Sequence, residues 1–162
     1  MTGSRLASAG ALTIVLGLAF YPALAAVSPF RAMAGSWSGG GALSTADGNQ
    51  ERLRCRASYD VSERGDKLSL NLRCASDSYN FDLAGNVEYR GGAISGEWTE
   101  SSRNASGNIE GRAAGDHVEA AARGPNFSAD LSLTTRGNRQ TISIRPQSGG
   151  DIRAVSLALG RR

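Results

Sequence analysis

The sequence predicts an all-β fold: a single antiparallel up-and-down meander of about ten strands that forms a barrel or a strongly curled sheet, after an N-terminal signal-peptide helix. Three observations support this prediction. Apolar and polar residues alternate along most of the chain after residue 34, with the period of a half-buried strand. Turn residues interrupt this alternation about every ten residues, which is typical of a sandwich or barrel. No stretch after residue 25 has a helical period.

The first 25 residues have the three parts of a secretory signal peptide. Arg5 supplies a short positive region, residues 6–20 form an apolar core, and Ala23-Leu24-Ala25 is a small-x-small cleavage site. A membrane anchor is the alternative, but the apolar core is short for a spanning helix. We expect a mature chain without a transmembrane span that forms one barrel-like domain over residues 26–162.

The composition bears on location more than on chemistry. The formal net charge of +3 includes Arg5 and is too small to indicate nucleic-acid binding. Lys67 is the single lysine, and the chain is rich in Arg, Ala and Gly, a bias typical of GC-rich bacterial genomes. Together with the signal peptide, this bias predicts a secreted protein of the bacterial periplasm.

The stretch 50–75 predicts the best-defined hairpin of the chain. When it folds back about Arg64-Gly65, residues whose numbers sum to 129 face each other, and Cys55 meets Cys74 on the apolar face. In an oxidising compartment the two cysteines predict a disulfide that stabilises the fold by about 3 kcal/mol. A pair of buried free thiols is the alternative. A two-residue turn would place the cysteines at a hydrogen-bonded site, with Cα atoms about 5.5 Å apart.

The other strands follow from the same alternation. Residues 35–43 form the first strand, with Trp37 facing inward. Ala84-Gly85-Asn86 is predicted to turn the chain, Pro146 to end its strand because it cannot donate to a ladder, and Ile152 to lie at a turn edge or bulge. The strands after the hairpin are expected at 79–83, 87–90, 94–99, 109–113, 118–122, 127–133, 142–144 and 155–159.

Four tight turns specify the register of the later strands. Each turn pairs apolar residues with apolar residues, so a slip by one position would turn the apolar set outward. Closure into a barrel would remove the exposed sheet edges. An outer-membrane barrel would alternate in the same way, but the aromatic residues are few and form no girdles. The expected pairs are Tyr89 with Ile94, Ala113 with Val118, Leu133 with Ile142, and Ile144 with Val155.

The sequence predicts no enzyme, no cofactor and no metal site. His117, the only histidine, follows Asp116 on an outward face, and no Gly-x-Ser-x-Gly elbow accompanies it. A hydrolase is the alternative, which requires a serine or carboxylate close to His117. With Cys55 and Cys74 paired, no zinc-ligand set remains. Arg64-Gly65-Asp66 matches the tripeptide that integrins bind, and it equally suits a hairpin turn.

A basic ridge is expected on the outer face of the hairpin. Arg52, Arg54 and Arg56 share that face, and Arg73 lies opposite Arg56. The ridge could hold lipid phosphates, an acidic polymer or a protein partner. No aromatic residue interleaves with it, which argues against nucleic acid. The alternative is a solvated face that Asp77 partly neutralises.

Seven aromatic residues are expected on the inner face, together with many Gly and Ala residues. Large and small side chains can interdigitate into a solid core, or they can leave a cavity for an apolar ligand. Inward tyrosines need hydrogen-bond partners for their hydroxyls and could supply them to a ligand. The candidate ligand-binding residues are Trp37, Tyr59, Tyr79, Phe81, Tyr89, Trp98 and Phe127.

Gly35-Ser36-Trp37, near the start of the first strand, resembles the Gly-x-Trp signature of the calycin group, which includes lipocalins and avidins. Gly96-Glu97-Trp98 is a second, similar segment. The resemblance implies an exported barrel with a cup for a small ligand. Small periplasmic inhibitors of secreted metalloproteases share an early Trp, one disulfide and a small barrel. The leading hypothesis is therefore a protein that binds a small apolar or amphipathic molecule inside the barrel. The alternative is a cell-envelope structural or protease-inhibitor-like protein that acts on an envelope component through its outer surface.

Overall fold

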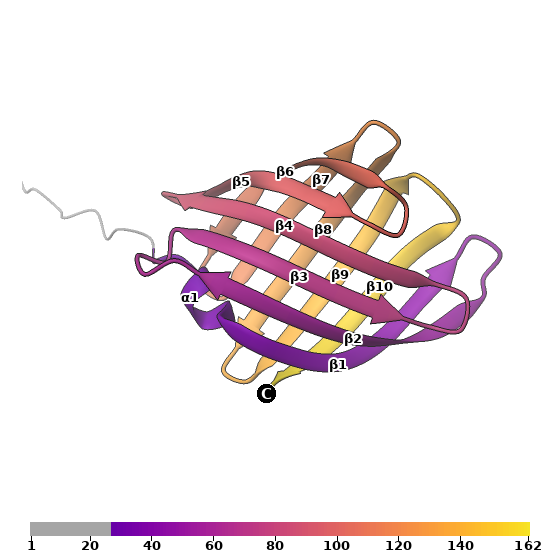
Figure 1. Cartoon of the computed structure of the whole chain (residues 1–162), viewed down its shortest axis with the longest axis horizontal. Helices are drawn as coiled ribbons and strands as arrows, with labels where there is room; N and C mark the ends of the chain where they lie inside the picture. Colours follow the sequence, from indigo (N-terminus) through magenta and orange to yellow (C-terminus); the bar gives the residue numbers. More distant parts are fainter. Residues whose placement is uncertain (1–26) are drawn as a thin grey trace, which may run out of the picture.

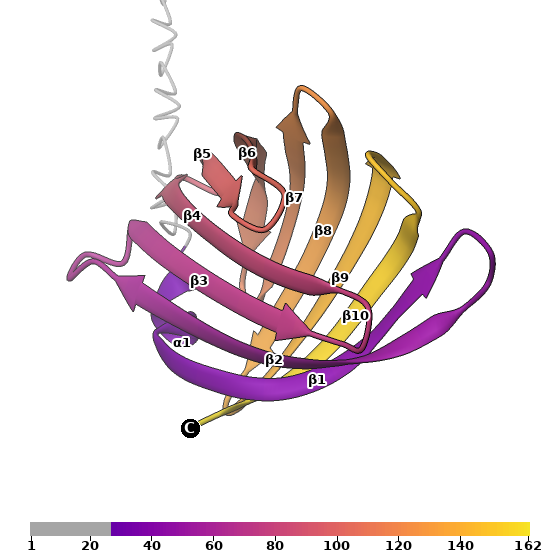
Figure 2. The same cartoon turned by 45° about the vertical axis from the view of Figure 1, so that its right-hand side comes forward.

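The computed structural model describes residues 27–162 and shows a closed antiparallel barrel. Ten strands follow one another around the barrel, and β1 pairs with β10 to complete the circle (Figures 1 and 2). The predicted all-β meander is confirmed, whereas the predicted signal peptide lies outside the described residues. The elements are α1 Phe30–Met33, β1 Gly35–Thr45, β2 Gln50–Val61, β3 Lys67–Ala75, β4 Asn80–Arg90, β5 Ala93–Glu100, β6 Ala105–Ala114, β7 His117–Gly124, β8 Phe127–Arg136, β9 Arg139–Ser148 and β10 Ile152–Arg161.

The predicted hairpin register is confirmed from Val61↔Leu68 to Cys55↔Cys74, and the two cysteines form a disulfide. Their Cα atoms are 4.1 Å apart, which is shorter than the spacing of about 5.5 Å expected for a two-residue turn. The turn is longer than two residues, because Ser62 donates its backbone N–H to the Lys67 carbonyl. This bond places the hydrogen-bonded pairs on outward residues and leaves the cysteines at a closer, non-hydrogen-bonded pair.

The four later hairpin registers are also confirmed, but two local predictions were wrong. Ala84-Gly85-Asn86 lies inside β4, where a Cβ on Gly85 would be 3.4 Å from the Leu70 side chain. Gly85 therefore continues the strand and does not turn the chain. Pro146 does not end β9: it pairs with Ala129 beside a bulge, past the last β9 residue that pairs with β10.

The short helix α1 closes one end of the barrel (Figure 1). Phe30 and Met33 are buried there, and the Trp37 indole donates a hydrogen bond of 2.7 Å to the Met33 carbonyl. The Arg161 guanidinium stacks 4.4 Å from the centre of the Trp37 ring and donates to the carbonyls of Ala32 and Ala34. These contacts tie the segment before β1 to the last strand. No helix within residues 27–162 is long and apolar enough to cross a membrane.

The seam between β1 and β10 depends on glycine. A Cβ on Gly41 would lie 1.8 Å from the Ser156 carbonyl oxygen of β10, which is closer than any side-chain atom can approach. Only glycine therefore permits this approach of the two backbones. The bulge at Thr45, which faces Ile152, ends the seam and places Ile152 where the sequence predicted an irregularity.

Candidate functional site

The barrel contains an apolar cavity of about 180 Å³. It lies toward the end opposite α1, among the first residues of β4, β6, β8 and β10 and the last residues of β5, β7 and β9. Cys74 also borders it, so the disulfide forms part of its wall. The aliphatic side chains of its wall include Leu70, Leu83, Ile109, Leu131, Ile144 and Leu157.

Two aromatic rings form one wall of the cavity. Trp98 and Phe127 meet edge to face, with ring centres 5.4 Å apart. The Trp98 indole N–H donates a 3.2 Å hydrogen bond to the Asn108 carbonyl. Because this bond satisfies the polar atom of the indole, the wall presents apolar ring surface to whatever occupies the cavity.

One cation borders the cavity. The Arg103 guanidinium lies 4.8 Å from the centre of the Phe81 ring, donates to the Asn80 carbonyl at 3.0 Å, and lies 3.6 Å from the Glu100 carboxylate. Glu100 is 7% exposed and accepts backbone N–H bonds from Asp82, Ser102 and Arg103. Burial would raise the pKa of the Glu100 carboxyl, but these hydrogen bonds together hold it below its usual value. Glu100 is therefore an ionised anchor of the β5–β6 turn.

The structure separates the seven predicted aromatic residues into two groups and one outlier. Phe81, Trp98 and Phe127 line the cavity. Trp37, Tyr59 and Tyr89 are buried outside its lining, and Phe30 of α1 meets Tyr89 with ring centres 6.1 Å apart. The outlier is Tyr79, which lies in the β3–β4 turn and donates a 2.6 Å hydrogen bond to Asp151.

Sequence reasoning missed a buried polar trio. The Tyr59 hydroxyl donates to the Gln140 side-chain oxygen at 2.8 Å, and the Gln140 amide donates to the Thr135 hydroxyl at 3.1 Å. All three residues are at most 5% exposed. Burial raises the pKa of the Tyr59 hydroxyl well above its usual value, and the hydrogen bond with Gln140 offsets part of this effect. Gln140 is two residues before the inward Ile142, so the alternation along β9 already places the Gln140 side chain inside the barrel.

The other candidate residues lie on the outside of the barrel. His117 contacts the Thr134 hydroxyl at 2.9 Å and the Glu119 carboxylate at 3.3 Å on the outer face of β7 and β8. A carboxylate therefore does approach His117, as the hydrolase alternative requires, but the pair lies on the outer surface and not beside the cavity. Within residues 27–162, no group of three or more His, Cys, Asp or Glu residues is placed to hold a metal ion. Arg73 pairs with Asp82 at 3.2 Å.

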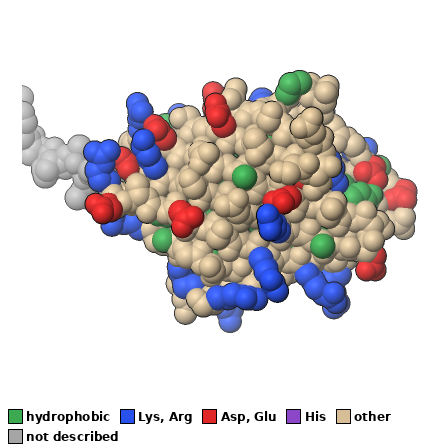
Figure 3. Space-filling view, viewed as in Figure 1, with side chains coloured by type: hydrophobic (Ala, Val, Ile, Leu, Met, Phe, Trp, Pro, Cys, Tyr) green, Lys and Arg blue, Asp and Glu red, His purple; other side chains and the backbone are tan. Residues whose placement is uncertain are grey.

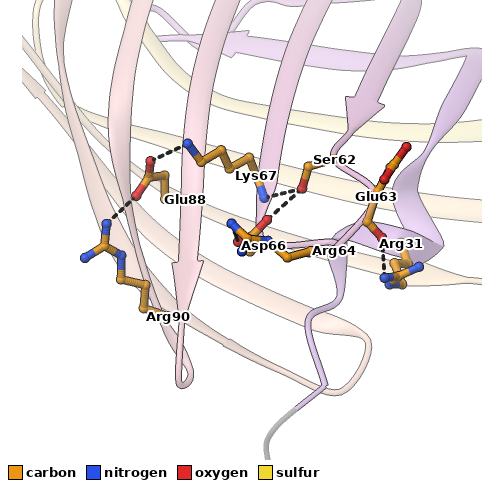
Figure 4. A network of polar contacts seen from close by, with 8 residues as sticks. All are labelled: Arg31, Ser62, Glu63, Arg64, Asp66, Lys67, Glu88 and Arg90. Atoms are coloured by element: carbon orange, nitrogen blue, oxygen red, sulfur yellow. Dashed lines mark hydrogen bonds and ion pairs between the residues drawn. The ribbon is translucent and has the colours of Figure 1, made fainter.

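The Arg64-Gly65-Asp66 tripeptide forms part of the β2–β3 turn. Arg64 and Asp66 pair with each other at 3.2 Å, and Ser62 donates to Asp66 at 2.8 Å (Figure 4). The same network continues through Lys67, whose ammonium lies 3.4 Å from the Glu88 carboxylate. These contacts give the tripeptide a structural role in holding the turn.

No protein-family model and no curated protein sequence match the chain. The fold occurs in solved structures of other proteins, two of which follow. The crystal structure of Rv2717c from M. tuberculosis is 16% identical with a TM-score of 0.66, and the match covers 81% of this chain and 93% of that one. The S-type phycobiliprotein lyase CPES from Guillardia theta is 11% identical with a TM-score of 0.56, and the match covers 82% of this chain and 89% of the other. The fold is thus a closed ten-stranded antiparallel barrel, which fits the resemblance drawn from Gly35-Ser36-Trp37 without assigning a family.

Proposed function

We propose that this protein binds a small, mainly apolar molecule in the cavity of its barrel. The observation that carries the proposal is the asymmetry of the barrel interior. Near α1, the aromatic residues and the polar trio fill the barrel, whereas toward the other end an apolar cavity remains. A protein interior is normally packed without voids of this size, so the cavity is a feature that a ligand would fill. One structural neighbour is a phycobiliprotein lyase, which is compatible with a barrel of this fold that holds a small molecule.

The volume limits the size of the ligand. About 180 Å³ is close to the roughly 150 Å³ that holds a benzene-sized molecule in an apolar protein cavity. It is smaller than the pockets of about 300 Å³ or more that hold drug-sized ligands. The expected ligand is therefore a one-ring or short-chain molecule. Arg103 at the rim would contact a polar end, if the ligand has one, while the apolar part lies against Trp98 and Phe127.

The test is a titration with indole and with octanoate, followed through the NMR signals of the Trp98 indole and of the methyl groups in the cavity wall. Binding of either probe should shift these signals and leave those of Trp37 unchanged, because Trp37 lies outside the cavity lining. A molecule as large as retinol should not bind. The proposal would be refuted if the signal changes were spread evenly over the whole surface. It would also be refuted if no signal changed at the highest soluble concentration of either probe.

A matched pair of variants separates cavity binding from surface adsorption. Ala122 lines the cavity, whereas its neighbour Ala121 points out of the barrel. Ala122→Leu should fill part of the cavity and weaken probe binding by about tenfold or more, since about 1.4 kcal/mol of lost contact corresponds to that factor. Ala121→Leu should leave the affinity unchanged.

We infer further that the protein acts by binding and not by catalysis. Glu100, the buried carboxylate of the cavity wall, is ionised and saturated with hydrogen bonds, which disfavours a role as general acid or base. The disulfide supports an exported location, in agreement with the predicted signal peptide. Mass spectrometry of the protein from a periplasmic extract tests this location: the expected species begins near residue 26 and contains an oxidised cysteine pair.

A further inference from the structure

Barrel closure joins arginines that are far apart in the sequence. Arg52, Arg54 and Arg56 are exposed along the outer face of β2. Arg139 and Arg145 are exposed along the outer face of β9. β1 and β10 lie between these two strands in the barrel. Only the pairing of β1 with β10 makes the two rows neighbours, three strands apart around the convex outer wall of the barrel.

The surface between the rows is lined by small residues. One row of paired residues crosses the four strands from β2 to β9: Arg56 pairs with Ser38, Ser38 with Gly160, and Gly160 with Arg139. The outward positions of β1 and β10 over this stretch are Ser38, Gly40, Ala42, Ser156, Ala158 and Gly160. We call this surface, with its two rows of arginines and its small-residue floor, the arginine trough. Its rows lie about 14 Å apart along the sheet, from the usual spacing of strands.

The arginines of the trough have no carboxylate partners. Within residues 27–162, none of the ion pairs includes Arg52, Arg54, Arg56, Arg139 or Arg145. Asp130 lies opposite Arg145 on β8 and keeps its charge while it accepts a hydrogen bond from Gln147, so Arg145 is partly compensated although it forms no ion pair. On β1, β2, β9 and β10, the single outward carboxylate of the described chain is Asp60, at the α1 end of β2.

The adjoining strands show the opposite pattern. On β3 and β4, Arg73 pairs with Asp82, and both Lys67 and Arg90 pair with Glu88. Figure 3 shows the consequence on one face of the molecule: blue side chains gather along its lower edge, over β1 and β2, while red ones lie mostly elsewhere. The charge of the barrel is therefore distributed unevenly, with an uncompensated positive region centred on the β1–β10 seam.

We propose that the arginine trough binds a linear acidic polysaccharide that bears carboxylate or sulfate groups. Alternate residues of a strand repeat about every 7 Å, so the β2 row presents regularly spaced guanidinium groups to a polymer with regularly spaced anions. Guanidinium groups bind carboxylates and sulfates through paired hydrogen bonds. The small outward residues of β1 and β10 leave room for the polymer to follow the curved wall from one row to the other.

The chemistry of the trough disfavours other polyanions. It has no exposed aromatic residue on which nucleic-acid bases could stack. It also has no large apolar side chain to insert into a lipid surface or to form the core of a protein interface: among the described residues, Val27 is the single exposed large hydrophobic, and it lies before α1. A partner recognised through ionic hydrogen bonds alone fits this composition best.

The test measures binding of a fluorescently labelled decamer of galacturonic acid by anisotropy, at several salt concentrations. The triple variant Arg52→Gln, Arg54→Gln, Arg56→Gln should weaken binding by about tenfold or more, because it removes three ionic contacts with the polymer. It should also flatten the salt dependence of the affinity. The double variant Arg139→Gln, Arg145→Gln should weaken binding as well, because the polymer spans both rows.

The control is a triple variant with the same change in net charge on another face: Arg90→Gln, Arg112→Gln, Arg123→Gln, all exposed on β4, β6 and β7. It should bind the decamer like the wild type, and far-UV circular dichroism should show that all variants remain folded. Equal losses in the two triple variants would overturn the proposal, because they would reflect net charge and not the trough. Absence of binding at low salt would also overturn it.

Two further probes distinguish the class of partner. These are vesicles that contain phosphatidylglycerol, and a DNA duplex of 20 base pairs. Tighter binding of either probe than of the decamer, with the same dependence on Arg52, Arg54 and Arg56, would show that the partner is a membrane or a nucleic acid and overturn the assignment to a polysaccharide. The Ala122→Leu variant should bind the decamer normally, since the trough and the cavity are on opposite sides of the barrel wall.

Discussion

Replacement of Gln140 by leucine tests the role of the buried polar trio. Leucine has a similar size, but it removes the acceptor of the Tyr59 hydroxyl and the donor to the Thr135 hydroxyl. Both hydroxyls then remain in the interior, because Tyr59 is 5% and Thr135 is 4% exposed. A buried polar group without a partner costs about 1 to 3 kcal/mol. The added apolar contact of leucine offsets part of this cost, so we expect a loss of about 2 to 4 kcal/mol in the free energy of unfolding.

A double-mutant cycle identifies the source of that loss. Tyr59→Phe alone leaves the Gln140 oxygen without its donor and should cost about 1 to 2 kcal/mol. In the Gln140→Leu background the same change removes an orphaned hydroxyl, so it should cost much less or even restore stability. The coupling energy between the two positions should therefore reach about 1 kcal/mol or more.

Urea unfolding followed by tryptophan fluorescence supplies the four free energies of the cycle. Gln147→Leu, a change of the same chemistry at an exposed position of the same strand, is the control and should alter stability by no more than about 0.5 kcal/mol. If the effects of Gln140→Leu and Tyr59→Phe simply add, the trio does not act as a hydrogen-bonded unit and the reasoning fails.

Three further predictions concern the disulfide, the β5–β6 turn and the barrel seam. Replacing Cys55 and Cys74 together by serine should lower the free energy of unfolding by about 3 kcal/mol, because their separation of 19 residues closes a sizeable loop in the unfolded chain; unchanged urea midpoints for the reduced and oxidised wild type would contradict this. The lowered pKa of Glu100 means that its stabilising effect is complete above the unfolded-state pKa of about 4.3 and is lost as the pH falls through the folded-state pKa. The stability difference between wild type and Glu100→Gln, measured by urea unfolding from pH 7 to pH 3, should therefore shrink below about pH 5, and a constant difference would disprove the account. Gly41→Ala should destabilise the barrel by about 1 to 3 kcal/mol in the same assay, because its Cβ would collide with the Ser156 carbonyl; wild-type stability would show that β1 and β10 can separate there without cost.

The register of the barrel was readable from the sequence because each strand has one buried face. A shift by one residue would have exposed a whole row of apolar side chains, so the alternation allowed a single alignment at each hairpin. The same logic predicted the disulfide, since Cys55 and Cys74 fall at facing positions. Turn chemistry was a weaker guide. Gly85 and Asn86 have the composition of a turn, but the inward alternation continues from Leu83 through Val87, and β4 follows the alternation.

The cavity could not be predicted from alternation. A repeat of two residues shows which side chains point inward, but it does not show how much of the interior they fill. The position of α1 decides that question. Phe30 and Met33 add side chains at one end of the barrel only, so Trp37 and Tyr59 pack there while Trp98 and Phe127 border a space at the other end. The rim residue Arg103 lies in a polar turn without alternation, and its approach to Phe81 depends on how that turn folds over the barrel.

The contact between Arg161 and the carbonyls near α1 constrains when the protein can finish folding. The Arg161 side chain reaches Ala34 across 127 residues of sequence. During synthesis β1 can therefore pair with β2 early, but its other neighbour, β10, is made only after the eight strands between them, so the closing contact forms late. If the proposed export carries the chain across a membrane unfolded, the barrel would close only after β10 has crossed.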